Sequence, residues 1–86
     1  MNINDLISII KKKLKNNFKI ENIIIEDKSF LHKKHVSNQA GKFHLKLNIN
    51  SDELKKLSRI DSNKKIYKVL NDELKEYIHS IQILIN

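Results

Sequence analysis

Hydrophobic residues near the N-terminus follow one another at steps of three and four positions. This spacing lines one face of an amphipathic helix, and most of the lysines at residues 11–15 fall on the other face. The polar segment at residues 16–18 ends the pattern. A helix is therefore predicted, with an inner face of Ile3, Leu6, Ile7, Ile10 and Leu14.

Three later segments have the pattern of strands. The clearest is residues 43–50, where an apolar residue alternates with a polar one, as expected of a strand with one buried and one solvated face. Residues 19–27 contain a β-branched run at 23–25. Residues 79–85 alternate again. The residues predicted to face the helices are Phe43, Leu45, Leu47, Ile81 and Ile83.

Two helices are predicted between the second and third strands. Ser51 suits the N-cap position of a short helix that runs to about Leu57, with two acidic residues in its first turn. After a turn at residues 58–63, Asp61 or Ser62 is predicted to cap a longer helix. Its predicted inner face contains Ile66, Val69, Leu70, Leu74 and Tyr77.

The predicted order is αββααβ in a single domain, residues 1–86. The first two strands can form an antiparallel hairpin, and the helical crossover permits parallel pairing of the third. The expected fold class is α+β: a two-layer domain with a three-stranded mixed sheet and the helices on one face.

The amino-acid composition indicates the compartment of the protein more clearly than its function. The 86 residues contain no cysteine, which excludes a disulfide framework and fits a reducing compartment. There is no membrane-length apolar run and no leader pattern, so a cytoplasmic protein is expected. The formal charge is +7, but lysine, asparagine and isoleucine make up about half of the chain. That bias points to an AT-rich genome rather than to a surface selected for nucleic acid.

Three of the four histidines lie within residues 32–44, a segment that is long for a hairpin connection. His32 and His35 form a His-x-x-His pair, which alone is a weak zinc pattern because zinc takes three or four ligands. A solvated loop is the plainer interpretation. His44 alternates with the buried residues, so it is expected to be a surface histidine or to contact a metal ligand without binding the metal itself. Asp27 and Ser29 are expected to shape the start of the loop.

These residues, in this order, resemble the BolA-like family along nearly the whole chain. Residues 27–32 resemble its Asp-Glu-Ser segment followed by a histidine, and His44-Leu45 resembles its His-Phe pair. Residues 66–81, IYKVLNDELKEYIHSI, match its Val-Tyr…Glu-Leu…Ile-His-Ala-Leu stretch without a gap. The chain departs from the family at residues 62–64, where Ser-Asn-Lys replaces Arg-His-Arg.

The resemblance implies a KH-like fold of the second topological type and a protein partner. Similar proteins bind a monothiol glutaredoxin, share a [2Fe-2S] cluster with it and with glutathione, and act in iron–sulfur trafficking or iron regulation. Carried over by position, the metal ligands of this chain would be His32 and His79, with His35 as the alternate. The isolated protein is expected to hold no cofactor and to be a monomer.

The alternative is a DNA-binding transcriptional regulator. In that case the helix–turn–helix of the KH-like fold would contact nucleic acid, through Arg59, Lys64, Lys65 and Lys68. The turn at residues 57–63 has no glycine, and aromatic residues are few, so neither a Gly-x-x-Gly clamp nor a stacking platform is predicted. An enzyme is not expected, because the chain has no thiol, no Gly-rich phosphate loop and no convincing pair of carboxylates.

Overall fold

The computed structural model describes residues 1–29 and 42–86. Its first element is α1 (Ile3–Asn17), which starts where the Asn2 side chain accepts a hydrogen bond from the Asp5 backbone N–H at 2.8 Å. Asp5 also places a negative charge in the first turn. The helix ends where Phe18 becomes extended, and it buries Leu6, Ile10 and Leu14 as the apolar spacing predicts.

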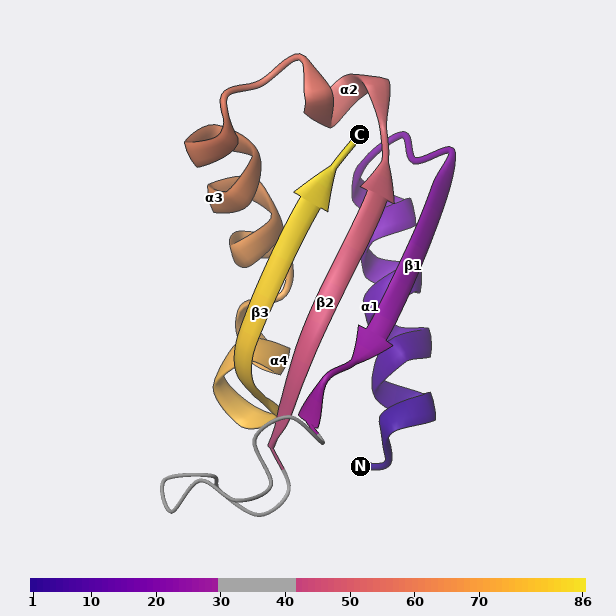
Figure 1. Ribbon diagram of the computed structural model, residues 1–86, viewed down its shortest axis with the longest axis vertical. Coiled ribbons are helices and arrows are strands. Elements are labelled where there is room, and N and C mark those ends of the chain that lie inside the picture. The colour runs from indigo at the N-terminus through magenta and orange to yellow at the C-terminus, as the bar shows by residue number, and fades with distance from the viewer. Residues whose placement is uncertain (30–41) are drawn as a thin grey trace.

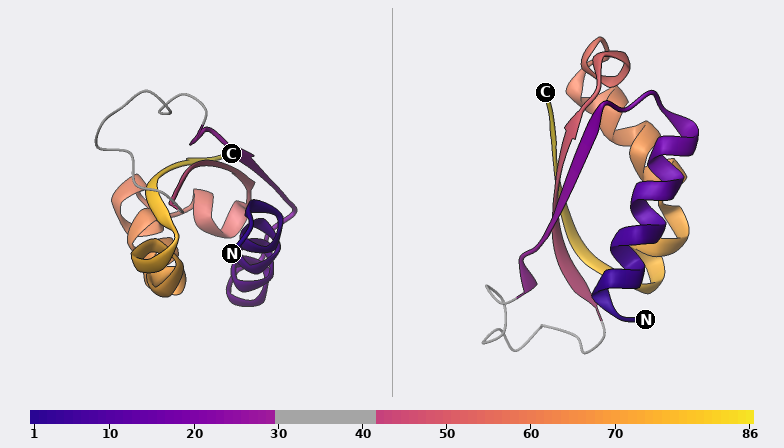
Figure 2. Two further views of the ribbon diagram at one scale, coloured as in Figure 1. Left: turned by 90° about the horizontal axis from the view of Figure 1, so that it is seen from below. Right: turned by 90° about the vertical axis from the view of Figure 1, so that its right-hand side faces the viewer.

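The strands β1 (Asn22–Asp27), β2 (Phe43–Asn50) and β3 (Ile78–Ile85) form one sheet in the order β1-β2-β3 (Figure 1). The β1–β2 pair is antiparallel and the β2–β3 pair is parallel, so the predicted mixed sheet is confirmed. Figure 2 shows that the helices cover one face of the sheet and leave the other face without a helix.

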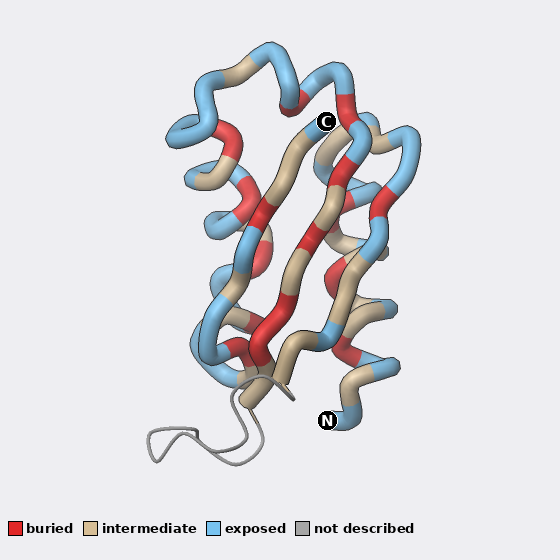
Figure 3. The backbone as a smooth tube through the Cα atoms, viewed as in Figure 1, coloured by how far each residue is buried: buried red, intermediate tan, exposed pale blue. Residues whose placement is uncertain are grey.

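The core lies between the sheet and the helices. Leu45, Leu47 and Ile49 on the central strand are buried and alternate with half-buried residues, as the upper part of β2 shows in Figure 3. Ile83 is buried, while Phe43 and Ile81 are partly buried against the same cluster. The five residues predicted to face the helices therefore all contact the core.

Three helices connect β2 to β3: α2 (Asp52–Lys55), α3 (Arg59–Val69) and α4 (Asn71–Glu76). The predicted cap of α2 is confirmed, because the Ser51 hydroxyl accepts from the Leu54 N–H at 3.1 Å. The same hydroxyl donates to the Lys19 carbonyl at 2.7 Å. Ser51 thus joins α2 to the chain before β1.

The predicted start of the longer helix is wrong. Ser58 is its N-cap, with its hydroxyl accepting from the Asp61 N–H at 3.0 Å, so Asp61 lies inside the first turn. Ser62 is buried and donates to the Arg59 carbonyl at 3.1 Å. The predicted continuous helix also bends at Leu70, which has φ −97° and ψ 17° and separates α3 from α4.

An ion pair joins the helices α1 and α4. Lys13 Nζ on α1 contacts both carboxylate oxygens of Glu73 on α4, at 2.9 and 2.7 Å. Within residues 1–29 and 42–86, no helix has the length and hydropathy needed to cross a membrane.

Candidate metal centre at the start of β3

A β-bulge at the beginning of β3 determines on which face of the sheet His79 lies. Phe43 pairs with Ile78 and His44 pairs with Ser80, so His79 is an extra residue with no single partner opposite on β2. An extra residue breaks the alternation of side chains along a strand. Ile78 is therefore buried and His79 is exposed, although the sequence alone places His79 in phase with the inward-facing Ile81.

His44 meets His79 at this bulge. The centroids of the two imidazole rings lie 4.8 Å apart, and the ring planes are inclined by 52°. His44 Nδ1 lies 2.7 Å from the Ser80 hydroxyl, within hydrogen-bond distance. The residue is only 5% exposed, so the expectation of a surface histidine is wrong. It lies on the helix-free side of β2 but is enclosed by its neighbours.

The backbone around His44 is also held. Its N–H donates to the Ser29 hydroxyl at 3.1 Å, and its carbonyl accepts from the Lys28 N–H at 2.7 Å. The Ser29 N–H in turn donates to the Asp27 carboxylate at 2.9 Å. Asp27 therefore bonds the local backbone at the predicted start of the loop, and Ser29 holds His44 from the β1 side of the sheet.

Two adjacent imidazoles can supply two nitrogen ligands to a metal. When Ser80 accepts from Nδ1–H of His44, the lone pair of that ring lies on Nε2, an arrangement typical of metal-binding histidines with a supporting hydrogen bond. Among the residues that the structure describes, no group of three or more His, Cys, Asp or Glu could hold a metal ion. Zinc takes three or four ligands, so two imidazoles alone do not make a complete zinc site within those residues.

The other two candidate ligands, His32 and His35, lie outside the described residues. The chain enters that segment after Ser29, which is bonded to His44. On the other side of that segment, β2 begins at Phe43, whose N–H donates to the Tyr77 carbonyl at 2.9 Å. Both ends of the segment that carries His32 and His35 are thus attached beside the His44–His79 pair.

Basic residues lie next to the pair. A shallow hollow of about 390 Å³ is lined by Lys28, His44, Lys46, Ser80 and Gln82, together with Leu45 and Ile81. Lys28 Nζ lies 2.7 Å from a Glu26 carboxylate oxygen. This hydrogen bond and the charge of Lys28 lower the pKa of Glu26, and the charge of Lys46 lowers it further.

The residues predicted to contact nucleic acid lie on different sides of α3. Arg59 lines a cavity between the α2–α3 region and β3. Lys65 and Lys68 line a separate hollow beside Asn17 and Phe18, at the end of α1. Lys64 is exposed. The structure therefore does not gather these four cations into one patch.

His44 is the site residue that sequence reasoning underrated. Parallel pairing of residues 43–50 with residues 79–85 would have brought His44 near the start of the last strand. The bulge is the part that alternation could not predict, because one inserted residue changes which side chains meet.

Comparisons with known proteins agree with the fold. A family model described as BolA-like protein matches residues 14–86. A protein of Haemophilus influenzae named DNA-binding transcriptional regulator BolA is 32% identical over 75 residues, which cover 87% of this chain and 70% of the relative.

Solved structures of BolA domains superpose well on the chain. The BolA domain of SufE1 from Arabidopsis thaliana has a TM-score of 0.77 and 29% identity, covering 92% of this chain and 87% of that one. BolA1 from the same plant has a TM-score of 0.74 at 22% identity, with the same coverage. The chain belongs to the BolA-like family.

Proposed function

We propose that this protein is a non-enzymatic, cytoplasmic partner of a monothiol glutaredoxin. In this proposal the two proteins share a [2Fe-2S] cluster and act in iron–sulfur trafficking or iron regulation. Membership of the BolA-like family supports the partner class, and one observation carries the chemistry. That observation is the exposed imidazole of His79 at the bulge of β3, with its ring centroid 4.8 Å from that of His44.

The residues present fit such a shared centre. This chain has no cysteine, so any ligands it provides are histidines, and the thiolates would come from the glutaredoxin and glutathione. Histidine in place of cysteine on one iron is established [2Fe-2S] chemistry and raises the reduction potential. His79 is exposed at a strand end and is our first ligand.

Two positions compete for the second ligand. His32 is favoured by its position in the family pattern, and it follows Ser29 by three residues. His35 is its alternate. His44 is favoured by its direct contact with His79. We assign the role to His32 and expect His44 to orient His79.

The test is reconstitution with a monothiol glutaredoxin, glutathione, iron and sulfide, followed by visible absorption and circular dichroism. The mixed complex should give a spectrum distinct from that of the glutaredoxin homodimer. His79→Ala should abolish it, because His79 is the exposed imidazole at the bulge whereas His44 is only 5% exposed, while the two apo proteins still associate. Lowering the pH should also remove the signal, because a coordinating imidazole must be neutral.

Further variants separate the two candidates for the second ligand. His32→Ala should weaken or alter the spectrum, and adding His35→Ala should weaken it further. His44→Ala should shift the spectrum less than His79→Ala does. Gln82→Ala, an exposed change on the same strand, is the matched control. An unchanged spectrum in the His79→Ala complex would remove the main chemical claim, and a complete loss with His44→Ala alone would transfer the second ligand to His44.

A second candidate function is regulation of transcription through DNA binding. It is favoured by the name of the Haemophilus influenzae relative. The cations available for it on this chain are Arg59, Lys64, Lys65 and Lys68. Arg59 lies on another side of α3 than Lys65 and Lys68, which makes a single specific contact surface less favourable than the metal-centre proposal.

A further inference from the structure

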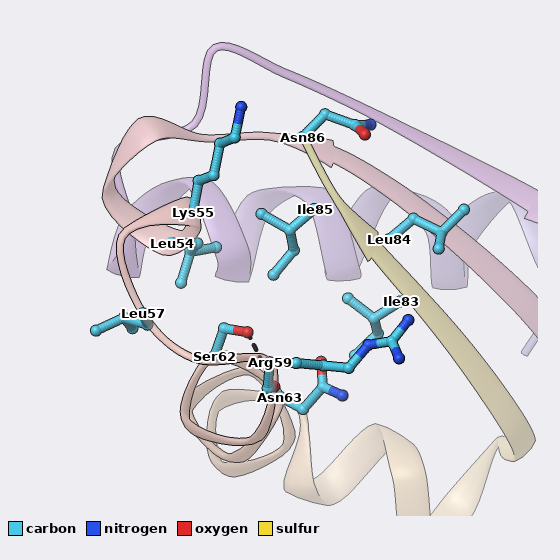
Figure 4. A pocket seen from close by; sticks show the side chains of 10 residues that line it. All are labelled: Leu54, Lys55, Leu57, Arg59, Ser62, Asn63, Ile83, Leu84, Ile85 and Asn86. Carbon is cyan, nitrogen blue, oxygen red and sulfur yellow. Dashed lines mark hydrogen bonds between the residues drawn. The ribbon is translucent and has the colours of Figure 1, made fainter.

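The far end of β3 carries a feature that the cluster proposal does not use. A cavity of about 260 Å³ lies between β3 and the helical segment of α2 and α3 (Figure 4). Its apolar lining includes Leu54, Leu57, Ile83 and Ile85. This volume is below the roughly 300–1,000 Å³ of typical small-molecule pockets, and it suits one aliphatic side chain better than a whole ligand.

The rim of the cavity is basic. Lys55 and Arg59 line it, and no acidic residue does. Within the described residues neither cation is in an ion pair. Figure 4 shows the Arg59 side chain extending from α3 toward Ile83 on β3. An apolar floor with an unopposed positive rim is complementary to an apolar side chain flanked by acidic groups.

The outer edge of β3 lies beside this cavity. In the described part of the chain, β3 has a strand on one side only. The Asn86 N–H donates to the Ile49 carbonyl at 2.8 Å, and its carbonyl accepts from the Ser51 N–H at 3.1 Å. Because successive residues of a strand alternate in direction, the backbone groups of Ile81, Ile83 and Ile85 point to the outer edge.

This edge also lacks the usual protection. Edge strands are normally blunted by charged residues or proline, and residues 81–85, Ile-Gln-Ile-Leu-Ile, contain neither. The other edge strand, β1, ends in Glu26 and Asp27. The bulge of β3 lies at its opposite end and leaves residues 81–85 regular.

From these observations we infer that β3 is a docking edge for an extended acidic peptide segment of a partner protein. The segment would add a fourth strand along residues 81–85, place an aliphatic side chain in the cavity, and set its acidic groups against Lys55 and Arg59. Strand addition of this kind combines main-chain hydrogen bonds with a side-chain pocket. A second copy of this chain fits less well, because each copy carries a formal charge of +7 and the same basic rim.

The probe is a fluorescein-labelled peptide with a central valine or leucine, glutamate two positions before and two positions after it, and threonine between them, so that the apolar and acidic side chains share one face of the added strand; binding is followed by fluorescence anisotropy. Binding should slow amide exchange at Ile81, Ile83 and Ile85. Arg59→Glu and Lys55→Glu should each weaken binding by about tenfold or more, because each reverses a charge on the rim. Arg59→Glu should fold normally, since an acidic residue is favourable in the first turn of a helix.

Two matched controls make the result decisive. Lys68→Glu makes the same change of charge on the same helix, away from the cavity, and should weaken binding by less than about threefold. A peptide N-methylated at every central residue, which cannot donate a backbone hydrogen bond from either edge, should not bind. The inference is overturned by absence of binding, by an equal effect of Lys68→Glu, or by undiminished binding of the N-methylated peptide.

A second copy of this chain or a nucleic acid at the β3 edge would each give a different experimental result. Sedimentation of the protein alone would detect a dimer, and protection of the same three amides in that dimer would assign the edge to a second copy. A single-stranded oligonucleotide that displaces the peptide, with the same dependence on Arg59, would assign the cavity to nucleic acid. Either result would overturn the peptide assignment.

Discussion

Leu47 lies at the centre of the sheet. It is fully buried, and its neighbours across the two ladders are Ile25 on β1 and Ile83 on β3. Because strands flank Leu47 on both sides, the structure has little room to close around the cavity that removing this side chain would leave. The stability of a variant at Leu47 therefore tests which face of the sheet forms the core.

We expect Leu47→Ala to lower the free energy of unfolding by about 2–5 kcal/mol, as large-to-small changes in a packed core do. Urea denaturation followed by far-UV circular dichroism measures it. Asn48→Ala, one residue along on the helix-free face, is the control and should change stability much less. A loss below about 0.5 kcal/mol for Leu47→Ala would mean that the core face is misassigned.

Glu26 and Lys28 form the ion pair nearest to the metal-centre residues. Their side chains are 2.7 Å apart, and the hydrogen bond and charge of Lys28 lower the pKa of Glu26. Because that pKa is lower in the folded chain than in the unfolded chain, the stabilisation is present above the unfolded value. It is lost as the pH falls through the folded value.

Lys28→Met should therefore raise the pKa of Glu26 toward its ordinary value, as followed by NMR titration of the side-chain carboxyl carbon. Added salt should do the same in the unsubstituted protein, because the pair is exposed to solvent. Lys42→Met serves as the control, as Lys42 does not contribute to the lowered pKa of Glu26. A pKa that Lys28→Met leaves in place would assign the lowering to another group.

At the scale of elements, one ion pair ties α1 to α4. Glu73 is nearly buried, with a side-chain exposure of 9%, whereas Lys13 is 36% exposed. A carboxylate in that setting depends on its partner, because an unpaired buried charge is costly. Solvent around Lys13 reduces the benefit of the pair below that of a fully buried one.

Lys13→Ala should destabilise the protein by about 1 kcal/mol, measured as a shift of the urea midpoint at constant slope. Lys12→Ala, an exposed neighbour on the same helix, should stay within about 0.5 kcal/mol of the unsubstituted protein. Combining Lys13→Ala with Glu73→Leu should recover stability, since no unpaired carboxylate then remains. Equal losses for Lys12→Ala and Lys13→Ala would show that the α1–α4 pair contributes nothing.

At the scale of the whole molecule, the bulk charge must be separated from any specific contact. The chain carries a formal charge of +7, and lysines attract a duplex through its phosphates whatever the sequence. Arg59 lies on the β3 side of α3, whereas Lys65 and Lys68 lie on the α1 side. A non-specific attraction would not distinguish these sides, but a true interface would.

We expect duplex DNA binding to fall steeply with salt and to be weak at physiological ionic strength. Arg59→Ala and Lys65→Ala should reduce it by similar factors, each lowering the slope of log affinity against log salt by a similar amount. Anisotropy titrations at several salt concentrations measure both. Binding that persists at physiological salt and depends on one side of α3 would favour the regulator over the cluster partner.

Much of the fold follows from periodicity in the sequence. The three-and-four spacing predicts α1, and the strict alternation of residues 43–50 predicts both the central strand and its buried face. These predictions hold because burial on one face imposes a period on the sequence. The cap at Ser58 was missed because Ser, Asp and another Ser occur within five residues, and local chemistry suits each of them.

The sequence by itself also determined which side chains are available for the site, namely four histidines and no thiol. It also showed the match to the BolA-like pattern along most of the chain. Only the tertiary structure decided that His44 and His79 meet, and that Arg59 lies apart from Lys65 and Lys68. The physical reason is that a parallel ladder brings residues 44 and 79 together across long sequence separation. The bulge then breaks the alternation from which a side chain's face is predicted.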